Sequence, residues 1–158
     1  MAHRVVTEQV ASPAAGADLA FTPSATDRVL LLAVTAVLTS SAAVANRRAA
    51  LVLQDQNALA YWSADAVEPQ AASLAVTYSW ARGAATPPIS ALVASERVSL
   101  PLPWLRLEPG DTVKTATAAV DVADQWSAII YRAVVGDWWE DEQELAHLAQ
   151  ALAIGAAG

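Results

Sequence analysis

The feature that most restricts the fold of this chain is an alternation of apolar and polar side chains with a period of two. In the segment 73–82, one side of an extended chain would carry larger side chains and the other side small or polar ones. The larger set is Leu74, Val76, Tyr78 and Trp80, and the smaller set is Ala75, Thr77, Ser79 and Ala81. This period is that of a half-buried β-strand, so the segment predicts a strand.

Further strand patterns follow one another along the chain. The run 27–39 is almost continuously apolar, as expected of a strand that is covered on both faces. The segment 47–63 has two apolar runs around Asp55-Gln56-Asn57, whose side chains can bond their own backbone in a turn, and it predicts a hairpin. Strands are also predicted at 112–120 and 125–135, with weaker candidates at 4–9 and 18–22. Roughly eight short strands at this spacing predict an all-β sandwich or barrel.

Prolines set one segment, 97–111, apart from the other strand candidates. Pro101, Pro103 and Pro109 have no backbone N–H to donate to a neighbouring strand. We therefore expect this segment at a sheet edge or extended over the surface, with a turn at Pro109-Gly110-Asp111.

The uncharged run Val29–Asn46 is close in length to a membrane-spanning helix and lies between Arg28 and Arg47-Arg48. Its second half is rich in Ser, Thr and small residues, and its first half in leucine and β-branched residues. A buried strand followed by a turn explains it better, and a transmembrane helix is the minority alternative. The first ten residues carry charged and polar groups, so they do not predict an export signal.

The length of 158 residues suits one folded domain. We predict a β-sandwich domain over 1–136 and a C-terminal helix with a flexible tail over 137–158. In the predicted helix, 138–154, acidic residues fill the first turn and leucines recur at helical spacing. Such a leucine stripe has to cover either its own sandwich or a neighbouring molecule.

Charge and composition exclude several functions. The net charge is -7 and Lys114 is the only lysine, so the surface would repel nucleic-acid phosphates. The absence of cysteine excludes disulfides and thiolate chemistry. His3 and His147 are the only histidines, and neither has a second histidine at metal-ligand spacing.

The acidic stretch Glu108–Arg132 admits a catalytic and a structural interpretation. Asp111, Asp121 and Asp124 fall where turns are predicted, and aspartate is common in turns because its carboxylate bonds nearby amides. We therefore favour turn residues over an acid/base pair. Trp126 is interpreted as a core anchor, with a sugar-stacking platform as the functional alternative.

No catalytic, cofactor-binding or metal-binding residue is predicted. The acid run Glu140, Asp141, Glu142 and Glu144 is better explained by the positive end of a helix than by a calcium or magnesium site. Tryptophans and the leucine stripe are instead predicted to bind a partner protein, since tryptophan is enriched at interface centres. For Trp138 and Trp139, packing of the start of the helix against the sandwich is an equally good interpretation. The predicted contact residues are Trp104, Trp138, Trp139, Leu145, Leu148 and Leu152.

Several segments resemble a loose group of small virion structural proteins of tailed bacteriophages and prophages. They are "EQVASPAAGADLAFTP", "TSSAAVANRRAALVLQD", "AASLAVTYSWA" and "LPLPWLRLEPGDTVKTATAAVDVADQWSAI". The resemblance covers most of the chain up to Arg132, and the part after Gly136 has no match within it. It implies a protein of the phage particle, assembled in the host cytoplasm.

Together, the resemblance and the strand pattern lead to one favoured function and two alternatives. We expect a non-enzymatic capsid decoration or cement protein: a jelly-roll-like antiparallel sandwich or barrel of about eight strands with a C-terminal α-helix. Its expected partners are the major capsid protein or other virion proteins and further copies of itself, with a trimer favoured and with neither nucleic acid nor membrane. The first alternative is a tail, neck or fibre component, including a carbohydrate-binding tip. A small hydrolase, which would need a cleft with two converging carboxylates, is the least favoured.

Overall fold

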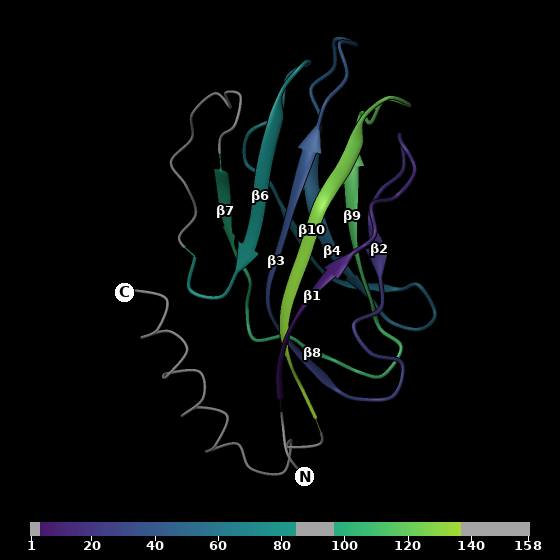
Figure 1. Ribbon diagram of the computed structural model, residues 1–158, viewed down its shortest axis with the longest axis vertical. Helices are drawn as coiled ribbons and strands as arrows, with labels where there is room; N and C mark the ends of the chain where they lie inside the picture. Colours follow the sequence, from purple (N-terminus) through teal and green to yellow (C-terminus); the bar gives the residue numbers. More distant parts are fainter. Residues whose placement is uncertain (1–3, 85–96, 137–158) are drawn as a thin grey trace.

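The computed structural model describes residues 4–84 and 97–136. These residues form ten strands in two sheets and no helix, which confirms the all-β prediction (Figure 1). The strands are β1 (Arg4–Val10), β2 (Ala20–Phe21), β3 (Val29–Thr39), β4 (Arg48–Gln54), β5 (Ala60–Asp65), β6 (Ala75–Ala81), β7 (Arg97–Pro101), β8 (Arg106–Leu107), β9 (Thr112–Ala118) and β10 (Gln125–Val135).

The strands form a six-stranded and a four-stranded sheet. In the six-stranded sheet the order is β1-β10-β3-β6-β7, with β8 paired to the beginning of β3. The other sheet has the order β2-β9-β4-β5. Figure 1 views the six-stranded sheet in front, with β4 and β9 behind it. The prediction of a purely antiparallel sandwich is wrong at one edge, where β7 runs parallel to β6.

Large aromatic side chains fill the space between the sheets. Tyr78 and Trp80 on β6 are fully buried, and their ring centroids lie 5.7 Å apart. Trp126 on β10 is 1% exposed and its ring centroid lies 5.8 Å from that of Tyr78. The alternation predicted for 73–82 and the interpretation of Trp126 as a core anchor are therefore confirmed.

The uncharged run at 29–46 forms the long central strand β3 and the turn after it. At the start of β3, residues 29–32 are all buried, as the near-continuous apolar pattern predicted. No helix within the described ranges 4–84 and 97–136 is long and apolar enough to cross a membrane.

β10 contains two irregularities that shift its pairing with β3. One lies between Ser127 and Ile130, where Ala128 has a positive φ of 48°, and the other lies between Arg132 and Ala133. The first adds a residue between the two inward-facing side chains Trp126 and Ile129, which strict alternation would place on opposite faces. A period-two pattern cannot show such a bulge.

The proline-rich segment lies at an edge, as predicted. β7 is the outermost described strand beside β6, and Pro101 is its last residue. The turn before β9 is also confirmed, because the Asp111 amide donates to the Glu108 carbonyl at 3.0 Å. β7 and β8 bring the count to ten rather than about eight, since both come from this segment.

Polar side chains close the end of the sandwich where β3 finishes and β4 begins. Arg47 and Asp124 form an ion pair of 2.9 Å in which both side chains are 0% exposed. The guanidinium also donates to the carbonyls of Ala43 and Ala45 and to the Ser41 hydroxyl. Through these bonds, the pair ties the 41–47 turn to the 121–124 turn.

Candidate functional site

Of the six predicted contact residues, only Trp104 lies within the described residues. The other five, Trp138, Trp139, Leu145, Leu148 and Leu152, lie outside them, as do the predicted helix and tail at 137–158. The partner-binding prediction for these five remains a prediction.

Trp104 follows β7 and keeps 46% of its surface exposed. The guanidinium carbon of Arg82 lies 3.0 Å from the centroid of its ring, an arrangement that attracts a cation to the aromatic face. Partial burial lowers the pKa of Arg82. We call Arg82 and Trp104 the anchor pair, because an exposed indole held by an arginine has the chemistry of a protein contact.

A polar hollow of about 520 Å³ lies at the end of the sandwich opposite the Arg47-Asp124 pair. Two turns frame it, the β4–β5 hairpin turn and the β8–β9 turn. We call it the Tyr61 pocket. Its lining residues are Asp55, Gln56, Asn57, Tyr61, Arg106, Glu108 and Asp111.

Hydrogen bonds within the two turns hold the Tyr61 pocket in shape. Asp55 Oδ1 accepts from the amides of Asn57 and Leu59, both at 2.8 Å, so the hairpin turn is bound to its own side chain. Gln56 Nε2 donates to the carbonyl oxygen of Pro109 at 2.6 Å and joins the two turns. Gly110 has a φ of +88° and approaches the Gln56 side chain too closely for a larger residue to fit without movement.

Tyr61 is oriented by a buried carboxylate. Its hydroxyl donates to Asp111 Oδ2 at 3.0 Å, and the same oxygen accepts from the Glu108 amide at 2.9 Å. Burial raises the pKa of Tyr61 well above its usual value of 10.0, and Asp111 raises it further. The phenol is therefore neutral at ordinary pH and its hydroxyl donates a hydrogen bond to Asp111. Tyr61 is nevertheless 43% exposed to solvent.

The Tyr61 pocket is negatively charged. Of its described lining residues, Asp55, Glu108 and Asp111 are acidic and Arg106 is basic. The pKa of Asp55 is lowered, chiefly by the Leu59 amide, so this group is ionised at neutral pH. Arg28 offsets part of the charge through a 3.0 Å ion pair with Glu108.

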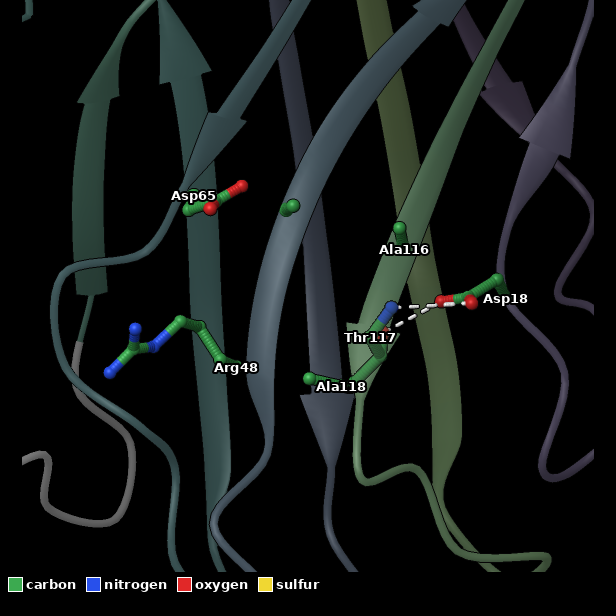
Figure 2. A pocket seen from close by; sticks show the side chains of 7 residues that line it. Asp18, Arg48, Asp65, Ala116, Thr117 and Ala118 are labelled. Atoms are coloured by element: carbon green, nitrogen blue, oxygen red, sulfur yellow. Dashed lines mark hydrogen bonds between the residues drawn. The ribbon is translucent and has the colours of Figure 1, made fainter. Parts of the chain in front are cut away.

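A second hollow, of about 400 Å³, lies on the outer face of the four-stranded sheet (Figure 2). Its floor consists of the methyl groups of Ala50, Ala116 and Ala118. Figure 2 shows Arg48 and Asp65 on one side of this floor and Asp18 on the other. We call it the alanine trough.

Asp18, on the rim of the alanine trough, accepts hydrogen bonds from two threonines of β9. Its carboxylate accepts from the hydroxyls of Thr115 and Thr117, at 2.9 and 2.6 Å, and from the Thr117 amide at 3.2 Å. These bonds attach the segment before β2 to β9. The trough therefore has a structural carboxylate at its edge.

The acidic residues singled out in the sequence are turn residues. Asp111 accepts from the Glu108 amide, and Asp124 accepts from the amides of Asp121 and Ser41, at 2.8 and 2.7 Å. Sequence reasoning did not identify Arg47 as the partner of Asp124 or Tyr61 as a surface group. The available signal for Arg47 was the arginine pair Arg47-Arg48 that precedes the apolar run 49–53.

Metal binding has no support in the described residues. Within 4–84 and 97–136, no group of three or more His, Cys, Asp or Glu side chains is arranged to hold a metal ion. The acid run at 140–144, for which a metal site was the less favoured interpretation, lies outside this part of the chain.

Comparisons with known proteins identify no relative. No protein-family model, no curated protein and no solved structure matches the chain. Its surface chemistry and strand order are therefore the basis for a functional proposal.

Proposed function

We propose that the chain is a non-enzymatic structural protein of a tailed-phage particle, a capsid decoration or cement protein that binds the head shell. The order of its strands is the observation that carries this proposal. Without β7 and β8, the sheets are β1-β10-β3-β6 and β2-β9-β4-β5. Two four-stranded sheets joined in this way are typical of a jelly roll, a fold that is common among viral capsid and lectin domains.

The pairing of the strands supports the jelly-roll assignment. β1 pairs with β10, β2 with β9, β3 with β8 and β6, and β4 with β5. These pairs are nested in the sequence: the strands of β4–β5 lie between β3 and its partners, which lie between β2 and β9, which in turn lie between β1 and β10. The chain is thus paired like one long hairpin whose successive strand pairs alternate between the two sheets. Such nesting produces the Greek-key connections of the jelly roll.

The anchor pair is the proposed contact with the shell. An interface needs large side chains that are exposed before binding and buried after it, and tryptophan and arginine are the most frequent of these. Trp104 meets this requirement at 46% exposure, beside the edge strand β7. The predicted contacts in 138–152 lie outside the described residues and remain a separate prediction.

Oligomerisation through sheet edges is part of the proposal, with a trimer expected. β1 has β10 as its strand neighbour within the described residues, and most of its side chains are exposed. An edge of this kind can pair with a strand of another molecule. The expected location is the phage particle, assembled in the host cytoplasm.

The proposal excludes catalysis because the carboxylates of the Tyr61 pocket serve as fixed acceptors. Asp55 binds two backbone amides, Asp111 binds an amide and Tyr61, and Glu108 binds Arg28. General acid/base work needs a carboxyl group whose pKa lies near the working pH, whereas that of Asp55 is lowered.

The binding experiment uses shells that lack this protein and measures co-sedimentation of added protein. Trp104→Ala is expected to weaken binding about tenfold or more, because truncation of an interface tryptophan commonly costs more than 1.4 kcal/mol. Its unfolding midpoint should stay close to that of the parent, since the indole is half exposed.

Val122→Ser is the matched control. This side chain is 83% exposed in the 121–124 turn, which is the opposite end of the sandwich from the Tyr61 pocket. Shell binding should be unchanged in the control. Equal binding by both variants, or no binding by the parent protein, contradicts the proposed contact.

A tail, neck or fibre component with a carbohydrate-binding site is the second candidate. The Tyr61 pocket favours it, because an exposed aromatic ring lies among polar turn residues at one end of the sandwich. Tyrosine packs on sugar rings through its face, and polar neighbours bind the hydroxyl groups.

A further inference from the structure

We infer that the Tyr61 pocket binds a neutral saccharide, and this inference rests on the second candidate function above and specifies its ligand. A site for a sugar requires an apolar platform, acceptors for several hydroxyl groups and a fixed shape. The described residues supply each of these.

The Tyr61 ring is the platform. Tyr61 lies on β5, one of the two edge strands of the four-stranded sheet, and is 43% exposed. Its hydroxyl is held by Asp111, so the ring has one orientation at the rim of the hollow. A ring that is already fixed loses little side-chain entropy when a sugar packs against it.

Asp111 and Glu108 are the acceptors. Asp111 is 6% exposed, and its Oδ2 atom accepts from the Tyr61 hydroxyl and the Glu108 amide, which fixes this carboxylate at the hollow. A carboxylate oxygen accepts a sugar hydroxyl through a charge-assisted hydrogen bond. Glu108 uses Oε2 for Arg28, and 56% of its side-chain surface is exposed to solvent.

The charge of the pocket selects against anions. Three carboxylates and Arg106 line it, in a chain whose net charge is -7. A sialic acid or a phosphate group would face like charges at short range, which costs free energy at a partly enclosed site. A neutral hexose or N-acetylhexosamine presents only dipoles and hydroxyl donors.

The test is a titration of the full-length, isotopically labelled protein followed by amide NMR shifts. D-glucose, D-galactose and N-acetyl-D-glucosamine are the neutral probes, and N-acetylneuraminic acid and spermidine are the charged ones. At least one neutral probe should shift the amides of the β4–β5 and β8–β9 turns. The dissociation constant should be on the order of 1 mM, the scale for about a dozen non-hydrogen atoms.

Three variants connect the shifts to the pocket. Tyr61→Ala removes the platform and should weaken binding at least tenfold. Glu108→Gln removes an exposed charge without disturbing the core and should weaken it several-fold, so the test does not depend on one variant folding. Asp65→Asn, on the same strand β5 but at the alanine trough, is the matched control and should bind like the parent protein.

Several outcomes would overturn the inference. The first is the absence of any shift with any neutral probe at about 50 mM, which is about fifty times the expected dissociation constant. The second is a stronger response to either charged probe. The third is sugar binding that Tyr61→Ala and Glu108→Gln leave unchanged. Shell binding is measured separately with Trp104→Ala, a variant that changes none of the residues that line the pocket. A protein that binds shells but no sugar therefore contradicts only this inference, and one that binds sugar but no shell contradicts only the decoration role.

Discussion

At the scale of single residues, buried charge shapes one end of this protein. Arg47 and Asp124 have no exposed side-chain surface, and removing two ions from water costs several kcal/mol for each. This desolvation cost is offset only when both ions are fully paired and hydrogen-bonded in the folded protein. Burial by itself would raise the pKa of Asp124, but Arg47 and the amides of Asp121 and Ser41 lower it by more.

Asp124→Ala should lower the free energy of unfolding by about 3–5 kcal/mol, because it leaves the Arg47 guanidinium buried without its partner. Replacing both residues, as in Arg47→Met with Asp124→Leu, should recover a large part of that loss. Asp65→Asn on the exposed rim of the alanine trough should change it by less than about 0.5 kcal/mol. Urea unfolding measures all three, and a loss below about 1 kcal/mol for Asp124→Ala would contradict the importance of the pair.

The same pair has a defined pH dependence. The pKa of Asp124 in the folded protein lies below the ordinary value of 3.8, so its stabilisation is complete above about pH 4 and is lost as the pH falls through the folded-state value. Unfolding measured between pH 7 and pH 2 should therefore show a smaller acid-induced loss for the double variant than for the parent. Parallel curves would show that Asp124 contributes nothing to acid sensitivity.

Residue types predicted part of this picture. Aspartates at turns and Trp126 in the core follow from local chemistry and size, and both predictions are confirmed. Arg47, the partner of Asp124, is 77 residues away in the sequence. The two turns of the Tyr61 pocket are joined by the hydrogen bond between Gln56 and Pro109, which are 53 residues apart. A single sequence can mark such residues as unusual, but it does not show which distant residues pair with one another.

At the scale of elements, periodicity predicted the strands better than their arrangement. Alternation located β6 and β9, and the apolar run located β3. The bulges in β10 and the parallel direction of β7 were not predicted, because neither changes the composition of a strand. Prolines did place β7 at an edge, since they restrict hydrogen bonding directly.

Two glycine turns allow a matched comparison. Gly16 and Gly83 have φ angles of +75° and +73°. A Cβ at Gly16 would lie 2.7 Å from Val122 Cα, whereas no atom of the described residues 4–84 and 97–136 lies within 4 Å of a Cβ at Gly83. Gly83→Ala should cost only the backbone strain of about 1 kcal/mol. Gly16→Ala should cost at least about 1 kcal/mol more, since the 121–124 turn has to move. Equal losses in urea unfolding would show that the two turns do not pack as described.

At the scale of the whole molecule, the two ends of the sandwich differ in chemistry. One end is closed by the Arg47-Asp124 pair, and the other carries the open Tyr61 pocket. The anchor pair lies beside the edge strand β7. Trp104 lies two residues before Arg106, which lines the Tyr61 pocket, so the two proposed contacts are neighbours in the sequence.

The most direct test of the proposed role is particle imaging of the phage at a resolution that traces this chain. The decoration role predicts many copies arrayed on the icosahedral shell, grouped as oligomers, with Trp104 buried against a capsid subunit. A few copies confined to the tail axis, with Trp104 exposed, would contradict it.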